Sequence, residues 1–258
     1  MSHPRPKKRF GQHFLHDRVV VSRIISSFRP QATDHVAEIG PGPGVLTREL
    51  APRVERLDAV EIDRDLAAAL STEFADQASV TIHEVDALSF DFCSLADPDE
   101  TLRLIGNLPY NISTPLLFHL FTQRHCIRDM LFMLQKEVVD RLCAVPGTKD
   151  YGRLSVMAQW QCQIERCFNV GPGAFTPPPK VDSAVVRLIP REAPVAVNDA
   201  DHFARVVKAA FGQRRKTLRN SLSEIMDADA IRAVGIDPVR RPETLSVEEF
   251  ASLANASG

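Results

Sequence analysis

Short apolar runs alternate with helix-forming segments over most of the first 190 residues, and this alternation limits the fold more than any other feature. Apolar runs bounded by turn residues are typical of buried strands. Parallel strands need long crossover connections, which are usually helices, so the pattern predicts an α/β fold with a mostly parallel sheet and helices on both faces. The seven strands that we expect are residues 36–39, 57–62, 79–85, 102–105, 130–134, 164–170 and 184–189.

Four helices are expected between these strands. The first covers residues 45–51, and Asp63 can cap the second. Ser113 can cap the third, with Pro115 tolerated in its first turn, and the fourth ends at Ala144. No helix separates the last two strands, so we expect them to be antiparallel.

The chain changes character after residues 190–198, a segment that contains two prolines and no periodic pattern. Helical patterns then follow one another without strands between them. We therefore predict an α/β domain over residues 1–190 and a small all-helical domain over residues 191–258. The helices expected in the second domain are 202–211, 214–226, 229–234 and 247–254.

The composition is that of an ordinary globular protein, since 44% of the residues are hydrophobic and 25% are charged. No apolar stretch approaches the ~20 residues that span a bilayer, and no apolar segment follows the basic N-terminus as it would in a secretion signal. Five cysteines at irregular spacing argue against a disulfide framework and against a zinc site. We expect reduced cysteines, no metal, no membrane association and a cytoplasmic protein.

Positive charge is segregated, although the formal net charge is only −2. Residues 5–9 contain four basic residues and no acidic one, and residues 205–219 contain six basic residues and no acidic one. A polyanionic partner needs a local basic face rather than a basic total, so either run could form a binding surface. The alternative is that both runs are solvated faces.

A glycine-rich turn, Gly40 to Gly44, follows the first strand and leads into a helix. Gly40 and Gly42 allow the backbone to turn tightly and to approach a ligand closely. A dinucleotide-binding fingerprint would place its third glycine where Val45 stands, so an NAD-dependent oxidoreductase is disfavoured. Gly-x-Gly-x-Gly is instead typical of methyltransferases that use S-adenosylmethionine.

Two acidic residues end neighbouring strands at the edge where open α/β sheets bind ligands. Glu61 ends the second strand, where a carboxylate can hold both hydroxyls of a ribose. Asp86 ends the third strand, where it can accept a hydrogen bond from an adenine amine. A lone acidic residue at a strand end is more often a cap or a surface charge, but two of them in register with the glycine turn favour a nucleoside site.

The segment after the fourth strand contains Asn107-Leu108-Pro109-Tyr110, which resembles the signature of enzymes that methylate the exocyclic amines of bases. Such an amine is a poor nucleophile because its lone pair is delocalised into the ring. The Asn107 side-chain oxygen and the Leu108 carbonyl can accept hydrogen bonds from it and localise the lone pair, and Pro109 restricts the backbone there. Tyr110 offers a ring face on which the base can stack.

Nearly the whole chain resembles the bacterial small-subunit ribosomal RNA adenine dimethyltransferases. The resemblance implies a Rossmann-like S-adenosylmethionine-dependent methyltransferase fold. It also implies the transfer of two methyl groups to each of two adjacent adenosines in a hairpin loop near the 3′ end of 16S rRNA, in immature 30S subunits. We expect the enzyme to be a monomer. The motifs that carry the resemblance are residues 9–15, 38–42, 106–113, 134–137, 151–155, 175–183 and 213–217.

The resemblance also implies roles for individual residues. It places His13 and Leu15 on the cofactor together with Gly40, Glu61, Asp86 and Asn107, and the alternative for His13 is a structural histidine. Phe175 opens a proline-rich loop and is expected either to stack on the base opposite Tyr110 or to anchor the loop in the interior.

A basic cluster at the start of the expected helix 214–226 predicts an RNA-backbone clamp. Cations at a helix N-terminus oppose the helix macrodipole, and a phosphate contact would offset this repulsion. The residues of the cluster are Arg214, Arg215, Lys216 and Arg219.

Two alternative functions rest on the same residues. Relatives that dimethylate 23S rRNA share much of the pattern, although the segments around Phe175 and Lys216 favour the 16S type. A ribosome-assembly checkpoint, which would act by occupying the immature subunit until methylation releases it, would use the same site.

Overall fold

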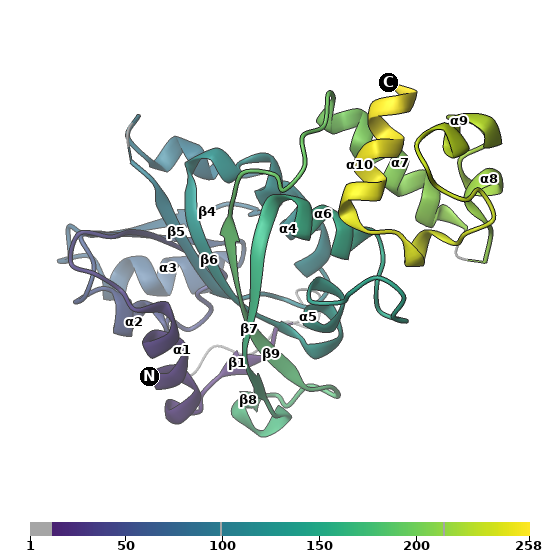
Figure 1. Cartoon of the computed structure of the whole chain (residues 1–258). Helices are drawn as coiled ribbons and strands as arrows, with labels where there is room; N and C mark the ends of the chain where they lie inside the picture. The colour runs from purple at the N-terminus through teal and green to yellow at the C-terminus, as the bar shows by residue number, and fades with distance from the viewer. Residues whose placement is uncertain (1–11, 99, 214) are drawn as a thin grey trace. The chain divides into compact units, whose positions relative to one another are not determined.

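The computed structural model describes residues 12–98, 100–213 and 215–258, which form two compact units (Figure 1). The first unit contains the described residues up to Val139 together with Glu165–Pro190, and the second contains Asp140–Ile164 and Arg191–Gly258. The sequence predicts a division at residue 190 alone. Residues 140–164 instead join the helical unit, because the Trp160 ring lies 4.7 Å from the Phe203 ring within it.

The first unit is built on a seven-stranded sheet with the order β4-β3-β2-β5-β6-β9-β7. Strands β2 to β6 pair in parallel, and β9 runs antiparallel to β6. The predicted α/β fold with a mostly parallel sheet is therefore confirmed. The strands are β2 (His35–Ile39), β3 (Arg56–Glu61), β4 (Val80–Glu84), β5 (Leu102–Asn107), β6 (Ile127–Gln135), β7 (Cys162–Val170) and β9 (Ser183–Pro190).

The strand order reverses its direction between β2 and β5. From β2 the chain steps outward to β3 and β4, and it then returns to the other side of β2 to form β5 and β6. Because parallel crossovers are right-handed, α2 (Thr47–Leu50) and α3 (Arg64–Glu73) lie on one face of the sheet and α4 (Ser113–Thr122) lies on the other. Ligands bind at such a reversal, outside the carboxyl ends of the strands.

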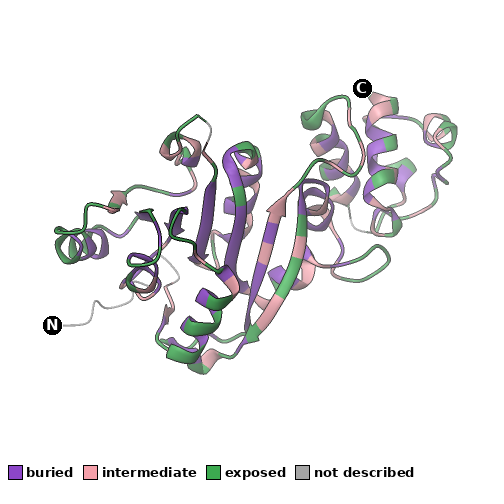
Figure 2. Cartoon of the chain, turned by 60° about the vertical axis from the view of Figure 1, so that its left-hand side comes forward, coloured by how far each residue is buried: buried purple, intermediate pink, exposed green. Residues whose placement is uncertain are grey.

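The central strands of the sheet are buried along most of their length (Figure 2). Val36, Leu104 and Phe132 are fully buried, one on each of three strands. Burial of such side chains stabilises the fold by about 1.5–3 kcal/mol each. This core holds the carboxyl ends of β2 and β5 in fixed register.

Two local expectations need correction in the first unit. Ser113 is the first residue of α4 rather than its cap, and its hydroxyl instead donates to the Pro109 carbonyl oxygen. The helix expected at 45–51 is limited to α2, because a tight turn continues up to Leu46. The helix expected to end at Ala144 is α5 (Lys136–Leu142), and the structure adds α1 (Arg18–Phe28), β1 (Phe14–Leu15) and β8 (Phe175–Thr176), which the sequence did not predict.

The second unit is helical, as expected, but its basic segment differs from the prediction. The helix expected over residues 214–226 is reduced to α8 (Leu218–Ser221), which begins after its cap residue Thr217. The other helices are α6 (Arg153–Gln161), α7 (Ala200–Gly212), α9 (Ala228–Ala233) and α10 (Val247–Ser257).

The expectation of reduced cysteines is also contradicted. Cys93 and Cys126 form a disulfide across a sequence separation of 33 residues, which spacing alone did not indicate. No helix within the described residues combines the length and the apolar character that a membrane crossing needs.

Candidate active site

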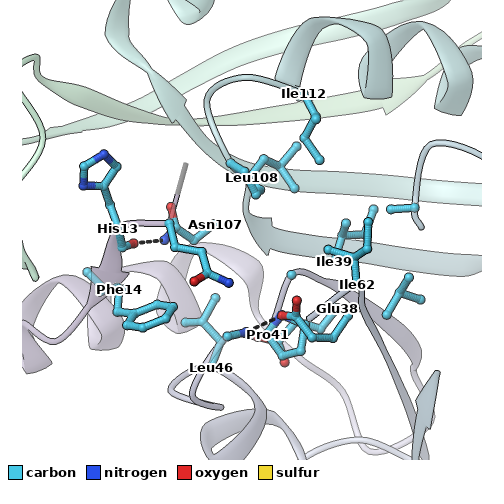
Figure 3. A pocket seen from close by; sticks show the side chains of 18 of the residues that line it. His13, Phe14, Glu38, Ile39, Pro41, Leu46, Ile62, Asn107, Leu108 and Ile112 are labelled. Carbon is cyan, nitrogen blue, oxygen red and sulfur yellow. Dashed lines mark hydrogen bonds between the residues drawn. The ribbon is translucent and has the colours of Figure 1, made fainter. Parts of the chain in front are cut away.

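A pocket in the first unit lies where the strand order reverses (Figure 3). It is lined by residues at or just after the carboxyl ends of β2, β3, β4 and β5, together with the segment that contains β1. The structure therefore brings together the parts of the chain that the motifs had singled out separately. The predicted residues that line it are His13, Leu15, Gly40, Gly42, Glu61, Asp86, Asn107, Leu108 and Tyr110.

The glycine turn forms the floor of the pocket between β2 and β3. Gly40 and Gly42 have φ angles of 67° and 56°, which favour glycine over residues with a side chain. Gly106 on β5 is required for a different reason, since a Cβ atom there would lie 2.3 Å from the Ile39 carbonyl oxygen. The close approach of β5 to β2 therefore depends on this glycine.

The Glu61 carboxylate is held under the turn by backbone donors. One of its oxygens accepts the Gly42 N–H at 3.0 Å, and the other accepts the Asp63 N–H at 2.9 Å. Burial raises the pKa of Glu61, although the N–H groups of Asp63 and Gly42 counteract part of this effect. A carboxylate has about four acceptor positions, so these two bonds leave further positions for a ligand.

A second carboxyl group, which the sequence motifs did not single out as chemically important, lies beside the turn. Glu38 is almost completely shielded from water and accepts a hydrogen bond from the Thr47 hydroxyl at 2.7 Å. Burial raises the pKa of Glu38 to about 7, and the negative charge of Glu61 adds to the increase. The sequence contained one signal for this residue: an acidic residue within an apolar strand is expected to be buried and hydrogen-bonded.

Asp86, after β4, also lines the pocket. One of its carboxylate oxygens accepts the Leu88 N–H at 2.9 Å, which fixes the side chain. The residue itself is exposed. Asp86 therefore both stabilises the turn after β4 and lines the pocket.

Asn107 is fixed by a contact that the sequence did not predict. Its Nδ2 atom donates to the His13 carbonyl oxygen at 3.0 Å, as the dashed line in Figure 3 shows. Because a carbonyl oxygen can only accept, this bond decides the orientation of the Asn107 amide. Its Oδ1 atom has no further hydrogen bond to the described residues and is left as an acceptor.

The His13 ring itself points away from the Asn107 side chain (Figure 3). Its Nδ1 atom lies 2.7 Å from the Pro177 carbonyl oxygen and must donate to it, while the ring centroid lies 5.3 Å from that of Tyr110. His13 therefore joins the arm that contains β1 to the proline-rich loop.

Leu108 and Tyr110 are anchored to the strands beside them. The Leu108 N–H donates to the Met133 carbonyl oxygen at 3.1 Å. The Tyr110 hydroxyl lies 2.7 Å from the Ser183 hydroxyl on β9, and burial raises the pKa of this tyrosine. These contacts fix the Leu108 backbone and the Tyr110 side chain on the two sides of Pro109, and both residues line the pocket.

Phe175 does not take the stacking position that we predicted. It is only 2% exposed and belongs to the hydrophobic core, where β8 pairs with β1 through the register of Leu15 with Phe175. It is not among the residues that line the pocket. The alternative role, an anchor for the loop, is the one that the structure supports.

The residues of the predicted RNA clamp lie in the second unit. Arg215, Lys216 and Arg219 are exposed, and Arg214 lies outside the described residues. Arg215 and Lys216 precede α8, so Arg215 and Arg219 do not share a helical face and the macrodipole argument fails for this segment. The basic residues 5–9 also lie outside the described residues.

Known protein families include one that matches this chain almost from end to end. The family model described as "Ribosomal RNA adenine dimethylase" matches residues 4–257. The chain belongs to this family. The predictions of an enzyme, of the methyltransferase fold and of adenine dimethylation in ribosomal RNA are thereby confirmed.

Curated members of the family are similar over almost their whole length. The ribosomal RNA small subunit methyltransferase A of Pseudomonas putida is 52% identical over 252 residues, which cover 97% of this chain and 94% of that protein. The protein of the same name from Hahella chejuensis is 54% identical, with 96% and 92% covered.

Two solved structures share the fold across both units. A dimethyladenosine transferase from Plasmodium falciparum has a TM-score of 0.80 at 25% identity, covering 93% of this chain and 96% of that chain. The 23S rRNA methyltransferase ErmE has a TM-score of 0.71 at 26% identity, covering 95% and 99%. The likeness to both shows that this chain shares its fold with a dimethyladenosine transferase and with a 23S rRNA methyltransferase.

Proposed function

We propose that this family member uses S-adenosylmethionine to dimethylate the N6 amines of two adjacent adenosines in the hairpin loop near the 3′ end of 16S rRNA. The observation that carries the proposal is the orientation of Asn107, whose amide nitrogen is held by the His13 carbonyl so that Oδ1 remains an acceptor. The names of the relatives with 52% and 54% identity favour the small subunit over 23S rRNA.

The pocket fits the cofactor by the chemistry of its donors and acceptors. Glu61 would hold the ribose hydroxyls, and Asp86 would accept from the adenine amine, as the backbone contacts of both carboxylates leave acceptor positions open. Gly40 and Gly42 would admit the cofactor close to the backbone. His13 and Leu15 would close the pocket from the arm. Bound S-adenosylmethionine supplies the methyl group on an activated sulfonium.

The chain's own contribution to the reaction is alignment and hydrogen bonding. Asn107 Oδ1 and the Leu108 carbonyl would accept from the two N–H groups of the target amine, which localises its lone pair on nitrogen. The Tyr110 ring would support the base, and its hydroxyl contact with Ser183 fixes the ring. The methylated amine is strongly acidic, so its proton can leave to solvent without a dedicated base.

The catalytic role of Asn107 is tested with immature 30S particles and tritiated S-adenosylmethionine, followed by nucleoside analysis. Wild-type protein should yield dimethyladenosine. Asn107→Ala should lower turnover by about 10²–10³, if this acceptor matters as much as an oxyanion-hole donor does elsewhere. Asn169→Ala, an exposed amide on β7, is the matched control. Wild-type turnover in the Asn107 variant would remove this loop from the reaction.

RNA docking is assigned to the helical domain, residues 191–258, through exposed cations in its basic segment. Arg215, Lys216 and Arg219 are exposed on and before a short helix, which suits contact with a flexible phosphate backbone. We further assign the protein to the cytoplasm as a monomer that binds immature 30S subunits.

The RNA contact is tested through its salt dependence. Changing these three residues to Gln should weaken RNA binding and flatten the slope of log K against log salt by about 0.7–0.9 for each phosphate that is no longer neutralised. Arg232→Gln is the control, because this exposed arginine is paired with Asp229. An unchanged slope in the triple variant would exclude a phosphate contact by these residues and leave residues 5–9 as the next candidate.

A further inference from the structure

A cluster of three metal-ligating side chains lies in the first unit, outside the pocket. Cys93, His125 and Cys126 each offer one ligand atom, and these three atoms all lie within 4.8 Å of one another. The ligands come from two segments far apart in sequence, the 3-10 turns η2 (Phe92–Leu95) and η3 (Arg124–Cys126). Rules based on closely spaced cysteine pairs therefore could not find the cluster.

The two turns are held together independently of the sulfur atoms. The Gln123 side chain accepts the Phe92 N–H at 2.6 Å and donates to the Phe90 carbonyl oxygen at 3.1 Å. His119 Nε2 also lies 2.8 Å from that carbonyl oxygen. The ligand-bearing segments are thus fixed next to each other before any bond joins Cys93 to Cys126.

The distances suit a tetrahedral ion once the disulfide is reduced. Zn–S and Zn–N bonds of about 2.3 and 2.0–2.1 Å place the sulfur and nitrogen ligands about 3.5 Å apart. Cys93 Sγ lies 3.4 Å from His125 Nε2. The sulfur atoms would separate to about 3.8 Å, which their 5.5 Å Cα–Cα distance allows as a side-chain adjustment.

We propose that the reduced protein binds a thiophilic divalent metal ion, with zinc as the best match, through Cys93, Cys126 and His125. Two thiolates and an imidazole form a soft ligand set, and exposure of His125 leaves a fourth position open to water. Binding releases the two thiol protons to solvent and leaves the site with no net charge. The ion would tie the connection between β4 and β5 to the start of β6.

Metal binding and the disulfide exclude each other because both use the same two sulfur atoms. A low-molecular-weight disulfide can oxidise the pair: a bond forms between Cys93 Sγ and Cys126 Sγ, the S–S bond of the reagent breaks, its two sulfurs take up two protons from solvent to become thiols, and the metal ion leaves. Reduction by a thiol reverses the exchange. The disulfide in the structure is the oxidised, metal-free form of the site.

The test uses the full chain, reduced, desalted without oxygen and titrated with Co²⁺. We expect one equivalent to bind with thiolate-to-cobalt charge-transfer absorption, and Zn²⁺ to displace it. Cys93→Ser and His125→Ala should each weaken Zn²⁺ binding at least 10-fold in competition with a chromophoric chelator, and Cys167→Ser should not. Because His125 is exposed, its variant tests the site even if a cysteine variant fails to fold.

A second experiment uses the oxidised protein. After treatment with oxidised glutathione the chain should bind no Co²⁺, and reductant should restore the binding. Absence of Co²⁺ binding in the reduced wild type would overturn the proposal and leave only a disulfide. Undiminished Zn²⁺ binding in both the Cys93 and the His125 variants would also overturn it, because the ion would then bind elsewhere.

Discussion

The strands β2, β3 and β5 carry polar groups at both of their ends, and the two ends use them differently. At the amino ends, Asp58 accepts hydrogen bonds from His35 and His83, each at 2.6 Å, and Arg103 donates to Asp34 and Asp129 at 2.6–2.9 Å. These side chains satisfy one another. None of the residues in this network lines the pocket, and their role is to fix the strands.

At the carboxyl ends, Glu61 and Asn107 are held by backbone groups instead. Gly42 and Asp63 donate to Glu61, and the His13 carbonyl accepts from Asn107. Each side chain is oriented from one side while acceptor capacity remains on the other, beside the pocket. The comparison teaches that the partner of a buried polar group, rather than its burial, distinguishes a binding group from a structural one.

Among the variants that test this comparison, a substitution of Arg103 should have the largest effect on stability. Its side chain is 4% exposed and forms ion pairs with Asp34 and Asp129. Arg103→Met removes the buried guanidinium that joins the two carboxylates. The partners that remain, Arg128 for Asp34 and Arg187 for Asp129, are more exposed, so the free energy of unfolding should fall by up to about 3–5 kcal/mol. Urea denaturation measures the loss, and the folded fraction should still bind S-adenosylmethionine with wild-type affinity.

Arg128 provides the matched control at the same edge. It also pairs with Asp34, at 3.0 Å, but its side chain is 52% exposed. Arg128→Met should cost no more than about 1 kcal/mol, because exposed ion pairs contribute little. Equal losses in the two variants would show that burial of the Arg103 network is unimportant.

An intermediate effect is expected at Glu61, on the other end of the sheet. Glu61→Ala removes a charged acceptor for the ribose hydroxyls and frees the Gly42 N–H that orders the turn. Hydrogen bonds to charged groups contribute about 1.5–3 kcal/mol each, so affinity for S-adenosylmethionine should fall about 10- to 100-fold in calorimetry. Glu55→Ala is the exposed control. Unchanged affinity in the Glu61 variant would remove this residue from the site.

Much of the fold and of the pocket could be predicted because the responsible signals are local. Strand periodicity located β2 to β6, and the glycine turn with Glu61 and Asn107 located the pocket. The predictions for Phe175 and for the cysteines were wrong because they depend on contacts between residues far apart in the sequence. The core of the first unit accommodates Phe175 through the pairing of β8 with β1, and the Cys93–Cys126 bond joins segments 33 residues apart.

The helix predicted over residues 214–226 was wrong for a different reason, because tertiary contacts there outweigh the local helix propensity. Leu218 and Arg219 donate their N–H groups to carbonyl oxygens of Arg240 and Pro238, so this stretch is tied to a neighbouring loop before a longer helix can form. Helix propensity is a weak prior where such tertiary contacts compete.

The smallest expected effect is on the pH dependence of stability, to which His35 and Glu38, at the two ends of the sheet, contribute over different pH ranges. Burial lowers the pKa of His35, but hydrogen bonds to Asp58 and Glu100 outweigh it and raise the pKa above 6.5. Its stabilisation is therefore complete below pH 6.5 and is lost as the pH rises through the raised pKa. The pKa of Glu38 is about 7 instead of 4.5, so its contribution is lost between pH 4.5 and about 7. The stabilisation by Asp58, whose pKa is about 2, is complete above pH 3.8 and is lost only as the pH falls below that value.

Unfolding free energies measured from pH 4.5 to 8.5 should resolve these two windows. His35→Gln should flatten the decline above pH 6.5, and Glu38→Gln should reduce the slope only below about pH 7, where Glu61 also contributes. Each group changes the slope by at most about 1.4 kcal/mol per pH unit. Slopes rather than absolute stabilities are compared, because either substitution also alters packing. If Glu38→Gln changed the alkaline slope and His35→Gln the acidic one, the assignment of the two ends would be reversed.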